Sequence, residues 1–276
     1  MYERACRELN SDQEARWLVE EVVSSPWPSA LDEVVAKQSG SRFEEMLRRR
    51  GEGEPLQYVL GHWSFRALDL MVDDRVLIPR PETEGVVEVA LQLLDDIAAP
   101  DPIAVDLGTG SGAIALSLAK ERRMGEVWAT DDSAGALAVA GANLAGVGGW
   151  AASRVRLARG SWWDALPDHL RGRVTLAVSN PPYISNGEWA GLDLVVQAWE
   201  PLSSLVAGPT GLEDVARVVA GARRWLVPCG GLVVEIAPHQ ADEAAALARE
   251  VGLGAVDVRI DLAGRPRALV ARAPRG

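Results

Sequence analysis

The sequence predicts an α/β protein in which a mainly parallel sheet follows a small N-terminal helical domain. From residue 103 onward, short apolar runs typical of buried strands alternate with helical stretches, the order that produces parallel sheets. A glycine-rich turn, 108–112, separates a strand from a helix, and the tetrapeptide 180–183 ends a later apolar run. Both features lie at the carboxyl ends of predicted strands, where open α/β sheets bind their ligands.

The N-terminal region, residues 1–60, has the pattern of a separate helical domain. Apolar residues recur at helical spacing over 12–23, and a segment rich in serine and proline, 24–28, interrupts them. Two further helices are predicted over 30–38 and 41–50. We see no catalytic-looking cluster of side chains in this region, so we interpret it as a docking module. A structural cap on the sheet is the alternative.

Residues 61–80 are predicted to link the helical domain to the sheet. The runs 62–65 and 68–72 have the pattern of a hairpin. A Pro-Arg-Pro sequence, 79–81, then leads into a helix whose first turn carries Glu82 and Glu84. Acidic side chains at that end interact favourably with the helix dipole. This helix opens the third region, 81–276.

The other elements of the third region follow in order along the chain. Strands are predicted at 103–107, 126–131, 154–157, 174–179, 232–236, 255–260 and 267–271, and helices at 113–120, 133–144, 212–226 and 240–251. The turn 263–266 joins the last two strands as a hairpin, which predicts an antiparallel strand closing the sheet.

The glycine-rich turn has the form of a ligand cradle. Asp106 lies in the buried strand 103–107, and Gly108, Thr109, Gly110, Ser111 and Gly112 follow directly before the helix. Glycines let the backbone approach a ligand closely. The spacing Asp-x-Gly-x-Gly-x-Gly differs from the dinucleotide fingerprint G-x-G-x-x-G. Asp131 ends the next strand, about 20 residues beyond the turn, where a carboxylate accepts hydrogen bonds from both hydroxyls of a ribose.

The tetrapeptide Asn180-Pro181-Pro182-Tyr183 follows the buried strand 174–179. Neither proline has an N–H to donate, and both fix φ, so the strand ends in a stiff, extended turn. An amide, two free carbonyls and a phenol ring then face the crevice. This set suits a planar amino group, whose two N–H donors need two acceptors and whose flat face needs an aromatic cover. An ordinary turn is the alternative, since Asn and Pro are common turn residues.

Charge and composition narrow the function classes. The net charge of −11 argues against broad binding to nucleic-acid phosphates, which needs a basic surface. The cysteines, Cys6 and Cys229, form no C-x-x-C, and the histidines, His62, His169 and His239, share no ligand spacing, so no metal site is predicted. No apolar run of about 18 residues occurs. We expect a cytoplasmic protein.

The motifs at 106–112, Asp131 and 180–183 resemble those of class I S-adenosylmethionine-dependent methyltransferases that modify exocyclic or amide nitrogens. Two further runs, 55–61 and 76–84, are similar to the HemK/PrmC family, which methylates the side-chain amide of a glutamine in peptide chain release factors. The resemblance extends from about residue 14 to about residue 272. Two departures are visible: Ser161 replaces an acid that is frequent in such enzymes, and the first helix is a few residues shorter than usual.

The resemblance implies a Rossmann-like seven-stranded sheet, residues 81–276 as the catalytic domain and S-adenosylmethionine as the cofactor. It implies methyl transfer to N5 of the glutamine in the Gly-Gly-Gln motif of a release factor. From charge and hydropathy we also expect no direct contact with nucleic acid or a membrane, and we expect a monomer. Cofactor contacts are expected from Asp106, Gly108, Thr109, Gly110, Ser111, Gly112, Asp131, Trp162 and Asn180. Catalysis is expected from Asn180, Pro181 and Tyr183, which bind the substrate together with Pro182.

Several alternatives remain open at this point. The target could be a glutamine of a ribosomal protein or an adenine amino group in DNA or RNA, although the last class needs a basic groove and a recognition domain that the sequence lacks. A nucleoside-binding scaffold without activity has no need of 180–183. Trp162 either covers the adenine or packs in the core. Glu235, at a strand end, either faces the crevice or is a satisfied structural carboxylate.

Overall fold

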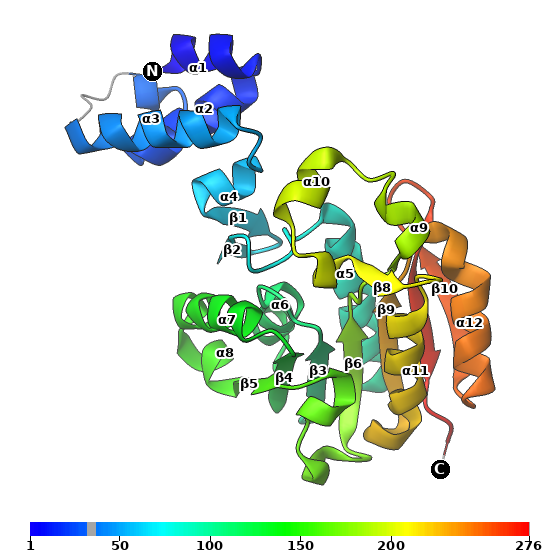
Figure 1. The fold of residues 1–276 in the computed structure, drawn as a ribbon. Helices are drawn as coiled ribbons and strands as arrows, with labels where there is room; N and C mark the ends of the chain where they lie inside the picture. Colours follow the sequence, from blue (N-terminus) through cyan, green and yellow to red (C-terminus); the bar gives the residue numbers. More distant parts are fainter. Residues whose placement is uncertain (32–36, 276) are drawn as a thin grey trace.

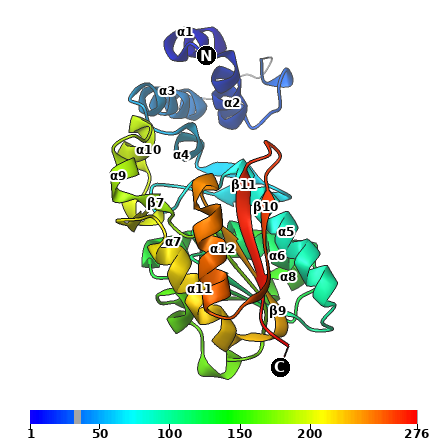
Figure 2. The ribbon, with the colours of Figure 1, turned by 90° about the vertical axis from the view of Figure 1, so that its right-hand side faces the viewer.

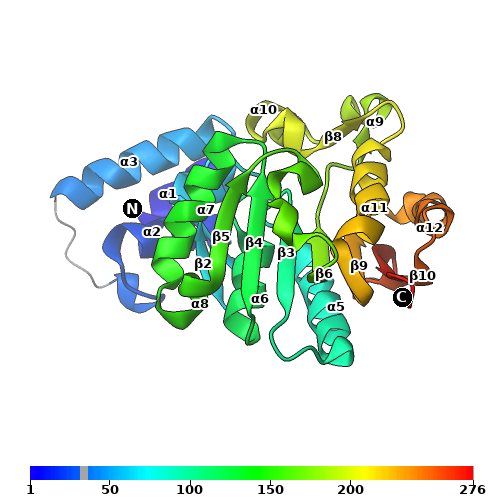
Figure 3. The ribbon, with the colours of Figure 1, turned by 90° about the horizontal axis from the view of Figure 1, so that it is seen from below.

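The computed structural model describes residues 1–31 and 37–275, and its main feature is a seven-stranded sheet with a helical unit at the N-terminal end (Figure 1). Across the sheet the strands follow the order β10 (Gly254–Ile260), β11 (Pro266–Arg272), β9 (Leu226–Glu235), β6 (Val174–Ser179), β3 (Ile103–Leu107), β4 (Glu126–Asp131) and β5 (Val155–Arg159). Figure 3 shows β5, β4, β3, β6 and β9 in succession. These five strands are parallel, and β11 runs antiparallel between β9 and β10. The predicted fold class is confirmed.

Helices cover both faces of this sheet because its strands are apolar on both sides. They are α5 (Pro81–Ile97), α6 (Ala113–Glu121), α7 (Ala134–Val147), α8 (Gly149–Arg154), α11 (Glu213–Trp225) and α12 (Ala241–Glu250). On one face, Leu91 of α5 and Leu116 of α6 share a buried cluster with Leu176. On the other, Val219 of α11 packs in a cluster with Val105. Figure 2 shows α11 and α12 on one side and α5, α6 and α8 on the other.

The largest displacement of a predicted strand concerns β9, which begins at Leu226 although the sequence indicated a start at 232. The Pro-Cys-Gly-Gly segment 228–231 has the composition of a turn. In the structure it continues the strand through an irregularity, where the register with β6 shifts between Val174 and Leu176. Cys229 takes a positive φ of 61° there. This irregularity accommodates within the strand the residues for which the sequence pattern predicts a turn.

The N-terminal unit contains α1 (Tyr2–Leu9), α2 (Asp12–Val23), a short 3₁₀ turn η1 (Ser29–Leu31), α3 (Lys37–Gly51) and α4 (Leu56–Leu60). It has a core of its own, built around Leu18, Phe43 and Leu47. The helix predicted over 41–50 lies within α3. The helix predicted over 30–38 falls largely on residues 32–36, outside the described residues. The sequence did not predict α1, whose one fully buried side chain is a small alanine.

Helix α4 joins this unit to the rest of the chain. Its Leu56 and Val59 belong to the core of the helical unit. Its Tyr58 is buried in a different cluster with Val76, beside α7, and the Tyr58 hydroxyl donates to the Val76 carbonyl at 2.6 Å. The predicted hairpin follows as β1 (His62–Phe65) and β2 (Leu68–Met71). One short helix thus packs on both sides of the boundary (Figure 1).

An excursion that the sequence did not predict follows β6 at the carboxyl edge of the sheet. It consists of β7 (Ile184–Ser185), α9 (Asn186–Trp189), α10 (Leu194–Trp199), the 3₁₀ turn η4 (Leu202–Ser204) and β8 (Val206–Gly208). Further 3₁₀ turns are η2 (Trp162–Ala165), η3 (Asp168–Leu170) and η5 (Pro238–Gln240). These elements are too short for a periodic pattern to identify them.

Candidate active site

A cavity of about 260 Å³ opens at the carboxyl edge of the parallel strands. The chain runs from β3 outward to β4 and β5, then returns across β3 to β6 and β9. Such a reversal of strand order leaves a crevice, the usual ligand site of this architecture. Of the residues predicted to form the site, eight line the cavity: Gly108, Thr109, Gly110, Ser111, Asp131, Trp162, Asn180 and Pro182.

The glycine-rich turn forms one wall of the cavity. The amides of Gly108 and Thr109 both donate to the carbonyl of Thr130, at 2.9 and 2.8 Å, so the turn is held against β4. Gly110 has a φ of +55°, a conformation that other residues rarely adopt. A Cβ built on Gly110 meets no atom of the described residues within 4 Å, so a ligand can lie against its backbone.

Asp131 holds this turn and faces the same space. Its Oδ2 accepts from the Gly110 amide and its Oδ1 from the Ser133 amide, each at 2.9 Å. Burial raises the pKa of Asp131 above the usual range for aspartate, against the lowering effect of these two amides. Each carboxylate oxygen has a second lone pair, so two hydroxyls of a ribose can still be accepted.

Asp106 and Gly112 lie behind the turn and do not line the cavity. Asp106 is fully buried, and its Oδ2 accepts from Thr109 Oγ1 at 2.5 Å and from the Ala115 amide at 3.1 Å. Burial raises its pKa to about 7. A Cβ on Gly112 would lie 3.1 Å from the Leu116 side chain. Both residues shape the turn from beneath, and a direct contact of either with the cofactor stays a prediction.

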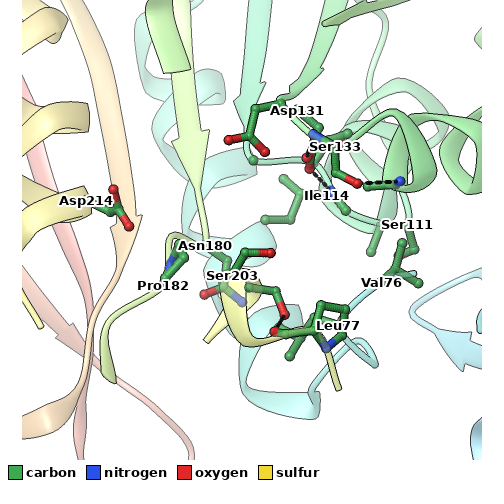
Figure 4. A pocket seen from close by; sticks show the side chains of 18 of the residues that line it. Val76, Leu77, Ser111, Ile114, Asp131, Ser133, Asn180, Pro182, Ser203 and Asp214 are labelled. Atoms are coloured by element: carbon green, nitrogen blue, oxygen red, sulfur yellow. Dashed lines mark hydrogen bonds between the residues drawn. The ribbon is translucent and has the colours of Figure 1, made fainter. Parts of the chain in front are cut away.

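Asn180 lies opposite Asp131 in the cavity (Figure 4). A chain of hydrogen bonds holds its side chain. Its Nδ2 donates to Thr83 Oγ1 at 3.2 Å, and Thr83 Oγ1 donates to Glu235 Oε2 at 2.7 Å. Because the amide nitrogen is engaged by Thr83, the carbonyl oxygen Oδ1 is left as the acceptor for a ligand. The Asn180 side chain thus offers the hydrogen-bonding polarity that a bound amino group needs.

The other residues of the tetrapeptide surround Asn180 without all reaching the cavity. Pro182 lines it, whereas Pro181 is buried and does not. Tyr183 is half-buried, with its hydroxyl 3.4 Å from Glu235 Oε1 and its carbonyl accepting from Gln240 Nε2 at 2.9 Å. Burial raises the pKa of the Tyr183 phenol. Its expected role as an aromatic cover stays a prediction.

Trp162 and α11 form the far end of the cavity. A Cβ on Gly108 would lie 3.3 Å from the Trp162 indole, so the two residues are in close contact. Asp214, in the first turn of α11, also lines the cavity and pairs with Arg217 at 2.9 Å. Burial raises the pKa of Asp214, and Arg217 opposes that rise. The cavity lining thus contains an acid, Asp214. It also contains Ser161, the residue that replaces an acid frequent in similar enzymes.

Sequence reasoning missed Thr83, Ser133, Asp214 and Arg217 as residues of this cavity. Thr83 and Asp214 each lie in the first turn of a helix, where acidic and hydroxyl residues are common for reasons of capping alone. Only Ser133 carried a signal from which the sequence could have placed it in the site. It lies two residues after Asp131 and caps α7, because its hydroxyl accepts from the Ala136 amide at 3.1 Å.

The run 76–84 also holds the segment from β7 to β8, residues 184–208, beside the cavity. Arg80 pairs with Glu200, a buried carboxylate at the end of α10, and the Ile78 amide donates to the same carboxylate at 3.3 Å. Pro201, Ser203 and Ser204 just beyond it line the cavity. The linker thus holds one part of the cavity lining in place.

The described part of the chain contains neither a cluster of metal-ligating side chains nor a helix suited to span a membrane. No group of three or more His, Cys, Asp or Glu side chains there could hold a metal ion. No helix there is both long and apolar enough to cross a bilayer.

Known proteins match this chain over most of its length. Residues 88–204 match the Methyltransferase small domain and residues 4–61 the PrmC N-terminal domain. The chain is 43% identical to the release factor glutamine methyltransferase of Bordetella pertussis, over 92% of each protein. It belongs to the release factor glutamine methyltransferase family. The family's member from Nitratidesulfovibrio vulgaris is 42% identical over 87% of this chain and 80% of that protein.

Solved structures agree with the fold. The catalytic domain of hMettl16, determined in complex with an RNA hairpin, superimposes with a TM-score of 0.58 at 14% identity, covering 86% of this chain and 82% of that one. The resemblance expected from the motifs is confirmed. The protein is an S-adenosylmethionine-dependent methyltransferase, and its cavity fits that cofactor: open space beside Gly110 and free acceptor capacity on Asp131 suit a nucleoside.

Proposed function

We propose that this protein methylates N5 of the glutamine side chain in the Gly-Gly-Gln motif of peptide chain release factors. The observation that carries the proposal is the orientation of Asn180, which lines the cavity. Its amide nitrogen donates to Thr83, and its oxygen has no hydrogen bond to any described residue, so that oxygen can accept from a ligand. A primary amide offers two N–H donors in a plane, and that oxygen can accept one of them. The release factor is the proposed partner because the similar proteins are release factor glutamine methyltransferases.

The residues of the tetrapeptide then have separate tasks. An amide nitrogen is a poor nucleophile because its lone pair is delocalised into the carbonyl. The bound cofactor supplies a methyl group already activated on a sulfonium. Asn180 Oδ1 accepts one N–H group. We assign the other to the carbonyl of Pro181, which is outside the cavity lining but is flanked in sequence by Asn180 and Pro182, which belong to it. The two acceptors align the nitrogen for in-line displacement. The same acceptors stabilise the positive charge that develops on the nitrogen. The Tyr183 ring excludes water, and the methylated nitrogen loses its proton afterwards.

The helical unit, residues 1–60, is proposed to hold the release factor at a second place. A short loop that enters the cavity binds weakly by itself, and a second contact on the same partner raises its effective concentration. Location in the cytoplasm, action as a monomer and the absence of direct nucleic-acid contact stay predictions.

The test is a transfer reaction with labelled S-adenosylmethionine and purified release factors, followed by mass spectrometry of the labelled peptide. Label on N5 of the Gly-Gly-Gln glutamine supports the proposal. Label on a glutamine of a ribosomal protein, or on adenine in DNA or RNA, with none on a release factor would replace it.

A further inference from the structure

We propose that Glu235 is a positioning residue for methyl transfer, which acts through Thr83 to fix which end of the Asn180 side-chain amide faces the substrate. The inference rests on the proposed function, because it assigns a cause to the acceptor that Asn180 presents. It gives a role to a buried carboxylate that does not line the cavity.

The sheet brings the three residues together. β6 and β9 are parallel neighbours in which Ser179 pairs with Val234, so Asn180 and Glu235 follow at adjacent positions beyond the paired ends. Thr83 comes from the first turn of α5 and lies between them, 2.7 Å from Glu235 Oε2 and 3.2 Å from Asn180 Nδ2. Glu235 and Thr83 are buried, so water does not compete freely for these bonds.

The polarity of this chain follows from a count of protons. A hydroxyl has one proton, and Thr83 donates it to the carboxylate of Glu235, an acceptor of the stronger, charge-assisted kind. Thr83 Oγ1 can then only accept from Asn180, so Asn180 must turn its NH₂ group toward Thr83. The two ends of an asparagine amide are nearly equal in shape, so packing alone does not distinguish them. The carboxylate supplies the distinction.

Protonation of Glu235 would remove this control over the orientation of the Asn180 side-chain amide. A neutral Glu235 can donate to Thr83 Oγ1, which releases the Thr83 proton for Asn180 Oδ1 and lets the amide rotate. The NH₂ group would then meet the N–H groups of the target amide. This reversal requires no movement of the backbone.

The surroundings of Glu235 bring this event near neutral pH. Burial raises its pKa to about 7, which the bond from Thr83 and the charge of Arg267 on β11 oppose. Glu82 on α5 adds to the rise, and the Tyr183 hydroxyl opposes it. The catalytic rate constant is therefore expected to fall on the acidic side of about pH 7, with the rate following the ionised fraction of Glu235.

The experiment measures kcat, KM and the Kd for S-adenosylmethionine from about pH 6 to about pH 9 in wild type and variants. Thr83→Val removes the hydroxyl at nearly constant volume and should lower kcat at least about tenfold, while Thr83→Ser restores it. Glu235→Gln should abolish the acid limb of the kcat profile, because the carboxyl group that orients Asn180 no longer titrates. Asp106, whose pKa is also raised to about 7, supports the cofactor turn through Thr109, so its titration is expected in the Kd for S-adenosylmethionine. The Kd for S-adenosylmethionine should change less than about twofold in all three.

Thr175→Val is the matched control. Thr175 is a buried threonine at the opposite end of β6, and its Oγ1 accepts from the Ile103 amide at 3.2 Å. It should lower stability without changing the pH profile. The proposal is overturned if Thr83→Val keeps wild-type kcat, if Thr83→Ser fails to rescue, or if Glu235→Gln keeps the acid limb. Thermal unfolding and cofactor binding verify that each variant is folded.

A second readout needs no protein substrate. The side-chain amide signal of Asn180, identified in a nitrogen-15 spectrum by its loss in Asn180→Ala, should titrate near pH 7 in wild type and stay constant in Glu235→Gln. An amide signal that does not titrate in wild type contradicts the inference. Failure of the proposed function has a different signature, since the wild-type enzyme would then leave release factors unlabelled while the amide signal still titrates.

Discussion

Replacing Asp131 by asparagine tests the part of the cavity that is assigned to the ribose. The substitution keeps the shape of the side chain but replaces one of two acceptor oxygens by an NH₂ group. In the structure both oxygens already accept from backbone amides, those of Gly110 and Ser133. Whichever way the new side chain turns, an NH₂ group faces a backbone N–H, and one of these two bonds is lost.

The magnitude follows from the bonds involved. A hydrogen bond to a charged group contributes about 1.5–3 kcal/mol and one between neutral groups about 0.5–1.5 kcal/mol, so two ribose hydroxyls lose about 2 kcal/mol together. The lost backbone bond loosens the turn before the ligand arrives and adds about 1 kcal/mol or more. The Kd for S-adenosylmethionine should rise by about 30-fold from the first effect and more than about 100-fold from both.

Titration calorimetry with S-adenosylmethionine measures this directly. The matched control is Asp242→Asn, which removes the same charge from an exposed position on α12. It should leave the Kd unchanged, so a long-range effect of net charge is separated from the local one. A folded Asp131→Asn enzyme whose Kd rises less than about threefold would refute the assignment of Asp131 to the ribose.

Four further changes have defined outcomes. Gly110→Val should abolish cofactor binding by calorimetry, because valine is strained at a φ of +55° and its side chain enters the space left for the ligand. Asn180→Ala should lower the methyl-transfer rate by about 10² or more in single-turnover assays and leave the cofactor Kd nearly intact. Since the pKa of Asp106 is raised to about 7, its contribution to stability should fall as the pH rises from about 4 to about 7, by up to about 1.4 kcal/mol per pH unit, and urea unfolding of Asp106→Asn should lack this slope. Deleting residues 1–50 should raise KM for the intact release factor far more than it alters cofactor affinity, which is measured first because the deletion uncovers part of α4.

The sequence predicted the elements that carry long apolar patterns. Each of the seven strands occurs within a few residues of its expected place except for the start of β9, because a buried parallel strand needs an uninterrupted apolar run. Short elements gave no such signal. The excursion from β7 to β8 depends on local caps, such as the reciprocal bonds of Ser185 and Glu188 at the start of α9, and on the tertiary ion pair of Arg80 with Glu200.

The candidate site was predictable where residues are adjacent in sequence and hidden where they are not. The turn 108–112 and the tetrapeptide 180–183 each follow one strand, so their position at the carboxyl edge is implied by the fold. Thr83 and Glu235 are 152 positions apart, and no sequence pattern predicts that their side chains form a hydrogen bond. The sequence left Glu235 between two interpretations, and the structure shows a buried carboxylate bonded to Thr83, one step from Asn180.

The packing of α4 sets the distance between the helical unit and the cavity. A loose tether would allow the helical unit to reach a partner over many separations. Here Tyr58 is buried on one side of α4 while Leu56 and Val59 are buried on the other, so a change of separation would have to break one of these two sets of contacts. If the helical unit holds a release factor, a glutamine reaches Asn180 only when its distance from the held surface matches that separation. Substrates would then be selected by the distance between their two points of contact as well as by chemistry. Residues inserted into the partner between its two points of contact should prevent methylation even though neither point has changed.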